Sequence, residues 1–271
     1  MSLVAVWQNE ERAGQPSLWL AGDSRISDGA GVLLNEGGKL FSLPVICRRP
    51  DEQGFFSIPY SVQDVGLACV GGTLIYQHVY ACLVPMLSSL LGDGRSVPSL
   101  EDIARTTATV TEKYVASLGQ TNPQAHRVGL VLAGYCVVHS RHEAYKLEPC
   151  FEDQLFRGFD ASALEIDTGQ VHFFGDYVVE AHDALKERRA ADEHRAPARV
   201  VRQFVDDPHY PSIGGDVQLG FTVGANFVRV TTVAPRVHGR PEAVIRFNNI
   251  DLEEIGDVGP CHIGIDGMTG V

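Results

Sequence analysis

The stretch Leu18–Arg25 reads Leu-Trp-Leu-Ala-Gly-Asp-Ser-Arg, an apolar segment that runs directly into a carboxylate and a guanidinium. Charged groups at the end of a buried strand are costly unless each of them meets a partner. The stretch therefore predicts a core strand over Leu18–Gly22, followed by a turn in which Asp23 and Arg25 are held. Two interpretations stay open for this turn, a simple ion pair at a strand end and part of an active site.

The residues before this strand supply a partner strand and a candidate nucleophile. Leu3–Gln8 has a strand pattern and Glu10–Pro16 is polar and turn-rich, so the first two elements are expected to form a hairpin. Methionine aminopeptidases remove Met1 when the next residue is small, which would leave Ser2 with a hydroxyl and a free α-amine. Such a residue can be nucleophile and general base at once, although Met-Ser is also a common start without catalytic meaning.

Lys39 lies sixteen residues after Asp23, immediately before the apolar Leu40–Leu43. A lysine that leads into a buried strand is most often a solvated edge residue. It could instead be held by Asp23 and directed toward Ser2, where its charge would lower the pKa of the serine hydroxyl and of the amine.

A further strand, Val65–Val70, ends in Gly71-Gly72 before a helical pattern begins. Backbone N–H groups at such a turn can bind an oxyanion or an extended peptide. A tight strand-to-helix turn that merely requires glycine would have the same sequence.

Strands and helices come in blocks along the chain. Hairpin connections dominate, which indicates largely antiparallel sheets, and the block order favours a layered α+β fold over a doubly wound parallel sheet. Helices are expected over Leu74–Leu90 with a kink at Pro85, Ser99–Leu118 with an N-terminal cap, Tyr177–Ala191 and Pro197–Val205, and later strands over Arg127–Val138, Glu143–Leu147, Gln170–Phe174, Val217–Val223, Phe227–Thr232 and Ala243–Phe247.

The order and spacing of these features resemble the N-terminal half of the proteasome beta-subunit superfamily, which belongs to the N-terminal nucleophile (Ntn) hydrolases. Shared features are the strand ending Ala-Gly-Asp-Ser-Arg, the Asp-to-Lys separation and the Gly-Gly-Thr turn. Bacterial members without a long propeptide look closest, including the two-component ATP-dependent protease subunit and the Anbu-type homologues. The resemblance implies Ser2 as nucleophile, Asp23 with Arg25 in support, Lys39 as catalytic lysine and Gly71 as oxyanion-hole glycine.

The second half of the chain resembles the family more loosely. Val171–Asp176 resembles its Gly-Ser-Gly segment, with Asp176 at the supporting serine, and Pro211–Leu219 resembles its Ser-Gly-Gly segment, with Ser212 near a second supporting position. The first hairpin is about five residues longer than in the family. The resemblance covers 2–232 as one Ntn-hydrolase domain and leaves 233–271 as a C-terminal extension.

The family implies a four-layer αββα sandwich that cleaves peptide or amide bonds in peptide or protein substrates. It also implies a homo-oligomer, as a ring or a helical stack. The chain has no phosphate-binding loop motif, so an ATPase unfoldase is a candidate partner. Two other readings stay open: a catalytically silent subunit with an assembly or scaffolding role, and an amidase that acts on small molecules.

Composition argues against several other classes. The chain has 22 lysines and arginines against 34 aspartates and glutamates, and a net charge of −12 argues against nucleic-acid partners. No apolar run reaches the roughly 18 residues of a membrane helix, so no membrane partner is expected. Six cysteines without a Cys-x-x-Cys pair indicate free thiols and a cytoplasmic protein. The ten histidines, including His139 and His142 at a hairpin turn, show no convincing metal spacing, so no metal or cofactor is expected.

Overall fold

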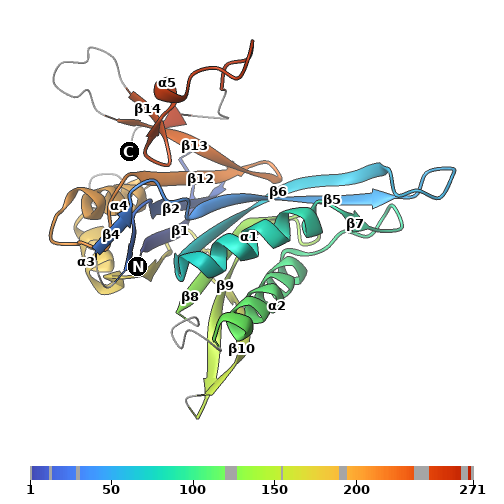
Figure 1. Cartoon of the computed structure of the whole chain (residues 1–271), viewed down its shortest axis with the longest axis horizontal. Helices are drawn as coiled ribbons and strands as arrows, with labels where there is room; N and C mark the ends of the chain where they lie inside the picture. The colour runs from blue at the N-terminus through green and yellow to red at the C-terminus, as the bar shows by residue number, and fades with distance from the viewer. Residues whose placement is uncertain are drawn as a thin grey trace. The chain divides into compact units, whose positions relative to one another are not determined.

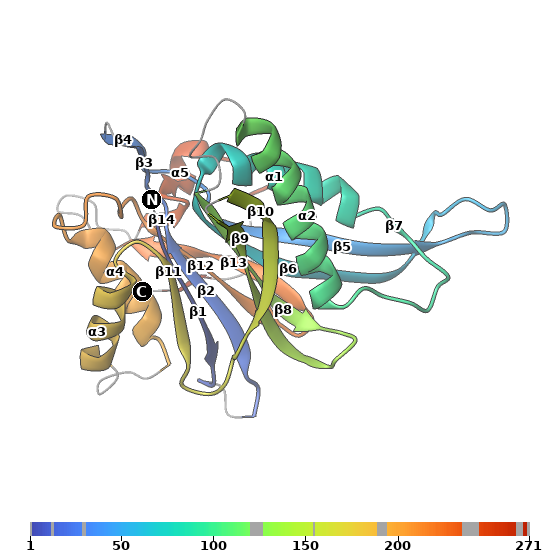
Figure 2. The same cartoon turned by 90° about the horizontal axis from the view of Figure 1, so that it is seen from below.

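The computed structural model describes residues 2–11, 14–28, 31–119, 127–153, 155–188, 194–234, 244–263 and 268–269. The chain divides into two compact units (Figures 1 and 2). The first unit comprises Met1–Leu40, Thr168–Phe221 and Val228–Val271, and the second comprises Phe41–Asp167 and Thr222–Phe227. Each unit is built on one sheet with helices packed against it.

The sheet of the first unit has the order β11-β1-β2-β12-β13-β14-β15, with β16 paired parallel to β13. The predicted hairpin is present, since β1 and β2 pair antiparallel with Trp7 opposite Trp19. This pairing places the end of β2 beside the start of β1. The strands are β1 (Leu3–Asn9), β2 (Ser17–Asp23), β11 (Val171–Gly175), β12 (Val217–Val223), β13 (Asn226–Ala234), β14 (Val244–Phe247), β15 (Ile250–Asp251) and β16 (Met268–Thr269).

Helices α3 (Val178–Arg188) and α4 (Ala196–Asp206) cover this sheet, as Figure 1 shows beside β1 and β2. Alternate residues of β1 point toward them, and Trp7 packs in one apolar cluster with Phe204 of α4. Pro197 lies in the first turn of α4, where its missing N–H costs no helical hydrogen bond. The unit also contains a small hairpin of β3 (Ile26–Asp28) and β4 (Gly31–Leu34), and a short helix, α5 (Leu252–Ile255).

The sheet of the second unit has the order β10-β9-β8-β6-β5-β7. Its pairs are antiparallel from β6 through β8 and β9 to β10, and β7 pairs parallel with β5. The strands are β5 (Leu40–Arg49), β6 (Ile58–Gly71), β7 (Leu90–Leu91), β8 (Val128–Cys136), β9 (Arg141–Glu152) and β10 (Leu155–Leu164).

Helices α1 (Thr73–Leu87) and α2 (Leu100–Gly119) lie side by side against the second sheet (Figure 2). Helix α1 contains Pro85 in its last turn and ends three residues before the expected Leu90. The expected cap of α2 is confirmed, because the Ser99 hydroxyl accepts the Asp102 N–H at 3.1 Å and the Asp102 carboxylate accepts the Ser99 N–H at 2.9 Å. Among the described helices, none is long and apolar enough to cross a membrane.

Three features of the second sheet differ from the sequence expectation. Strand β6 begins at Ile58 rather than Val65, and β5 continues to Arg49, well beyond the apolar Leu40–Leu43. The sequence also gave no signal for β10, which pairs with β9 over most of its length. These segments are half exposed and mixed in polarity, so hydrogen bonding to distant neighbours decides their conformation rather than local hydrophobic pattern.

Candidate active site

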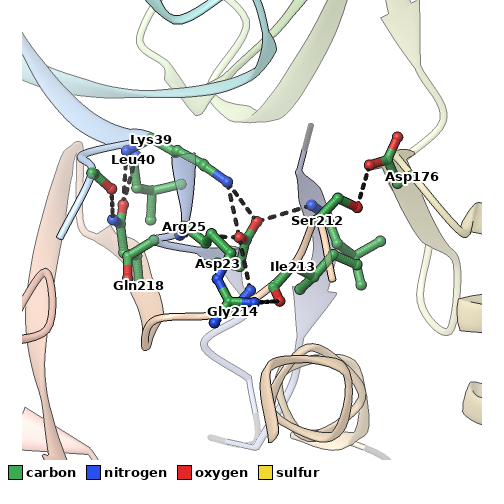
Figure 3. Close-up of polar contacts among 12 residues, drawn as sticks. Asp23, Arg25, Lys39, Leu40, Asp176, Ser212, Ile213, Gly214 and Gln218 are labelled. Carbon is green, nitrogen blue, oxygen red and sulfur yellow. Dashed lines mark hydrogen bonds and ion pairs between the residues drawn. The ribbon is translucent and has the colours of Figure 1, made fainter. Parts of the chain in front are cut away.

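Asp23, the last residue of β2, is fully buried, and its carboxylate accepts hydrogen bonds from four groups (Figure 3). Its carboxylate accepts backbone N–H groups of Leu3 at 3.0 Å, Arg25 at 3.1 Å and Gly214 at 3.2 Å. Both oxygens also lie 2.9 Å from Nζ of Lys39. The lysine and three main-chain donors together compensate the buried negative charge.

Lys39 is 1% exposed, so the structure excludes the solvated-edge interpretation. Gln218 of β12 fixes the main chain at this point, since its Oε1 accepts the N–H groups of Lys39 and Leu40 at 3.0 and 2.9 Å. The Gln218 amide in turn donates to the carbonyl of Gly37 at 2.6 Å. Burial lowers the pKa of Lys39 below its ordinary value, although the Asp23 carboxylate opposes this shift.

The Arg25 side chain binds Asn35 and two main-chain carbonyls instead of the Asp23 carboxylate. Its Nε donates to the Asn35 side chain at 3.0 Å, and its Nη1 donates to the carbonyls of Pro211 at 3.2 Å and Ile213 at 3.0 Å. The cation paired with Asp23 is therefore Lys39, and the Arg25 guanidinium does not form the ion pair with Asp23 that was one interpretation of this turn. Arg25 instead positions the loop that carries Ser212.

Ser2 immediately precedes β1 and is 2% exposed. Its carbonyl accepts the Asp176 N–H at 2.7 Å, and the next residue, Leu3, donates its N–H to Asp23. The Asp176 carboxylate accepts the Ser212 hydroxyl at 2.6 Å, as Figure 3 also shows. The fold thus gathers Asp23, Asp176 and their partners around the start of β1. Met1 lies outside the described residues, so its removal stays a prediction.

Two residues of the site, Gly215 in the turn before β12 and Ser24 after β2, were not among the predicted site residues. Gly215 has φ +76°, and a Cβ there would lie 2.3 Å from the Asn35 carbonyl oxygen. Ser24 is buried here and its hydroxyl accepts the Asp216 N–H at 2.8 Å. The Gly214-Gly215 pair was the available signal, because paired glycines mark places where backbones approach closely.

Gly71 lies at the end of β6 with φ +81°, and a Cβ there would lie 2.1 Å from the Arg127 carbonyl oxygen. The neighbouring Gly72 N–H donates to that same oxygen at 2.8 Å. The turn therefore requires glycine for its own geometry. Gly71 belongs to the second unit whereas the other predicted site residues belong to the first, so its assignment to an oxyanion hole stays a prediction.

The site consists of a buried carboxylate–ammonium pair, a second carboxylate and hydroxyl groups, all near the start of β1. A buried cation close to a hydroxyl can stabilise negative charge that develops on that oxygen. In the part of the chain that the structure describes, the one cluster of side chains suited to a metal lies elsewhere, in the second unit, at Cys136, His139 and Glu143.

Comparison with known proteins gives a structural likeness only. No family model matches the chain, and no curated protein matches it. A subunit from the helical assembly of the Anbu complex from Pseudomonas aeruginosa is 15% identical, with a TM-score of 0.53 over 84% of this chain and 85% of that one. The Anbu (Gly-1) mutant from Hyphomicrobium sp. strain MC1 is 14% identical, with a TM-score of 0.48 over 82% of each chain. The chain is therefore similar in fold to the Pseudomonas aeruginosa Anbu subunit.

Proposed function

We propose that this chain is a proteasome-like Ntn hydrolase that cleaves peptide or amide bonds, with Ser2 as nucleophile once Met1 is removed. The observation that carries the proposal is the buried Lys39–Asp23 pair, whose aspartate also accepts the main-chain N–H next to Ser2. A buried ion pair seldom improves stability over apolar packing, so a functional reason for keeping one is favoured.

In the proposed reaction, the Ser2 hydroxyl oxygen attacks the substrate carbonyl carbon while the α-amine of Ser2 takes the hydroxyl proton. The Lys39 ammonium lowers the pKa of the hydroxyl and of the amine through its charge, and Asp23 holds it in place. The Gly71 N–H helps to hold the oxyanion. Asp176 and Ser212 position the main chain of Ser2.

Collapse of the tetrahedral intermediate breaks the C–N bond, and the protonated α-amine returns its proton to the leaving amine. The acyl group then remains as an ester on Ser2. Water, deprotonated by the same amine, attacks this ester and releases the carboxylic acid, which restores the serine hydroxyl. The net reaction is amide plus water to acid plus amine.

The likeness to the Anbu subunit supports further proposals on architecture. We place 2–232 in a four-layer αββα sandwich, with 233–271 as an extension. We also propose that the chain forms a homo-oligomer, since the similar Pseudomonas aeruginosa subunit is described in a helical assembly. Peptide or protein substrates, an ATPase unfoldase as partner and a cytoplasmic location complete the proposal.

A catalytically silent assembly subunit is the second candidate. Asp176 at the position of the family's supporting serine, and the near-complete burial of Ser2, favour it. The two candidates differ in what happens at the N-terminus. The hydrolase requires a free α-amine on an accessible Ser2, whereas an assembly subunit does not.

Intact-mass measurement separates these candidates. The freshly purified chain is weighed alone and after incubation with a peptide epoxyketone, a reagent that needs both a free amine and a hydroxyl on one residue. The hydrolase predicts loss of Met1 and one adduct per chain, retained in Ser2→Thr and absent in Ser2→Ala. Retained Met1 without an adduct would exclude the hydrolase and favour the assembly subunit.

A further inference from the structure

The turn between β8 and β9 brings three potential metal ligands together. Cys136 ends β8, His139 lies in the turn and Glu143 is the third residue of β9. Cys136 Sγ lies 3.5 Å from His139 Nδ1, which lies 2.8 Å from Glu143 Oε1, and all three ligand atoms fall within 4.8 Å of one another. A single ion could therefore contact all three.

We propose that Cys136, His139 and Glu143 form a binding site for a divalent transition metal, zinc by its ligand preference. Thiolate, imidazole and carboxylate are the three donor types that zinc takes in proteins, and three protein ligands leave a fourth position for water. With Zn–S near 2.3 Å and Zn–N near 2.0–2.1 Å, tetrahedral donors stand about 3.5 Å apart. The observed sulfur–nitrogen separation of 3.5 Å matches this value, whereas His139 Nδ1 and Glu143 Oε1, at the hydrogen-bond distance of 2.8 Å, would move apart on binding the ion.

Groups around the ligands hold two of them in place. The Tyr145 hydroxyl donates to Glu143 Oε2 at 3.2 Å, which leaves Oε1 to face His139. The N–H of Leu100, at the start of α2, donates to Cys136 Sγ at 3.5 Å, and a helix N-terminus favours negative charge on such an atom. Such partners of the ligands orient them and contribute to metal affinity.

Gln63 of β6 adds an independent observation. Its Oε1 is buried and has no hydrogen-bond partner among the residues that the structure describes. The paired register of β6 and β8 ends at Gly66↔Ala133, three residues from Gln63 on β6 and three from Cys136 on β8. By alternation it lies on the same face of the sheet as Leu67, the face that carries Cys136 in the apolar cluster. An amide oxygen without a partner can accept a hydrogen bond from a metal-bound water.

The competing interpretation is a hydrogen-bonded network without metal. Nε of Arg141 lies 2.8 Å from the same Glu143 oxygen that contacts His139. The Arg141 side chain is 70% exposed and the His139 side chain 40% exposed, so both can turn away while Cys136 and Glu143 stay buried. The two interpretations differ in what happens when Arg141 is removed, since a metal site would lose a competing cation.

Zinc titration of the full-length chain tests the proposal. The chain is stripped with EDTA and titrated with ZnCl₂ against a chromophoric chelator, and with Co²⁺ to detect the thiolate-to-metal charge-transfer band. The proposal predicts one zinc per chain and a Co²⁺–thiolate band. His139→Ala should weaken zinc binding ~100-fold or more, and Cys136→Ser should abolish the band.

Arg141→Ala should tighten zinc binding by up to about fivefold, because an exposed ion pair is weak and its loss frees the carboxylate. His209→Ala and Cys150→Ser, which alter a histidine and a cysteine away from the cluster, should bind like the wild type. Circular dichroism checks that each variant is folded. Because the His139 side chain is half exposed, His139→Ala should fold, and it still tests the proposal if Cys136→Ser misfolds. Absence of stoichiometric zinc binding, or equal affinity in His139→Ala, would overturn the proposal.

Discussion

Removing either partner of the Lys39–Asp23 pair should destabilise the first unit, and by unequal amounts. Breaking a buried ion pair costs about 3–5 kcal/mol because the remaining charge stays buried. In Lys39→Met the Asp23 carboxylate keeps its three main-chain donors, from Leu3, Arg25 and Gly214. We therefore expect a loss near the lower value, about 3 kcal/mol.

In Asp23→Asn the loss should approach the upper value, about 5 kcal/mol. The buried Lys39 ammonium loses its counter-charge, and the new amide NH₂ faces main-chain N–H donors. One amide oxygen cannot serve all the donors that the two carboxylate oxygens accept. The double variant should lose less than the sum of the single variants, by about 2–3 kcal/mol, because the two side chains interact directly.

Urea unfolding followed by tryptophan fluorescence measures these values. Trp7 and Trp19 lie on β1 and β2 with ring centroids 5.7 Å apart, and Trp19 stacks on Phe221 at 4.8 Å, so both indoles report on the first unit. Chain concentration is held fixed because any assembly would add to the apparent stability. Lys186→Met, which removes an exposed ion pair, is the matched control and should leave the transition unchanged.

Either of two outcomes would refute this reasoning. Single variants within about 1 kcal/mol of the wild type would mean that the pair is solvated rather than buried. Strict additivity in the double variant would mean that Lys39 and Asp23 do not interact.

Three further predictions concern other positions. In circular dichroism melts, Gly71→Ala should destabilise the second unit by more than about 1 kcal/mol, the cost of a positive φ, because the new Cβ would lie 2.1 Å from a backbone oxygen. The control Gly72→Ala should destabilise it far less, because its Cβ would lie 3.6 Å from the nearest atom. Hydrogen bonds from Ser99 lower the pKa of Asp102, so this carboxylate stabilises the fold fully above about pH 4 and its contribution is lost as pH falls through the lowered pKa. Asp102→Asn should cost about 1 kcal/mol at pH 7 and progressively less as pH falls below 4. Ser212→Ala removes a hydrogen bond to a carboxylate worth about 1.5 kcal/mol at least, so epoxyketone adduct formation should slow about tenfold; an unchanged rate would remove Ser212 from the site.

Local sequence predicted the features that local physics controls. The β1–β2 hairpin, the Ser99–Asp102 cap and the proline-led start of α4 follow from patterns a few residues long. For Lys39 the sequence left two interpretations open, a solvated edge residue and a partner of Asp23, because the choice depends on whether its side chain is buried. A single charged residue before an apolar run does not reveal whether its side chain is enclosed.

Long-range contacts account for what the sequence did not predict. Arg25 binds carbonyls 186 and 188 residues further along, and Gln218 fixes the main chain of Lys39 from 179 residues away. No spacing rule covers such distances. Strand β10 was missed because its pattern is weak and its pairing with β9 defines it.

The cluster of Cys136, His139 and Glu143 was not recognised for a different reason. Cys136, His139 and Glu143 were visible in the sequence, but their meaning depends on the register of β8 and β9, in which Cys136 pairs with Arg141. That register puts Glu143 on the same face as Cys136, whereas His142 points elsewhere and contacts Thr222 at 2.9 Å. A Cys-x-x-His pair across a hairpin turn was the usable signal.

The fragment mass spectrum of the N-terminal peptide, taken after epoxyketone treatment, tests the central claim most directly. We predict that the peptide begins at Ser2 and carries the reagent on both its α-nitrogen and its Oγ, and that Lys39→Met greatly slows its formation. An N-terminal peptide that begins with unmodified Met1, or a reagent bound at another residue, would contradict the assignment of Ser2 as nucleophile.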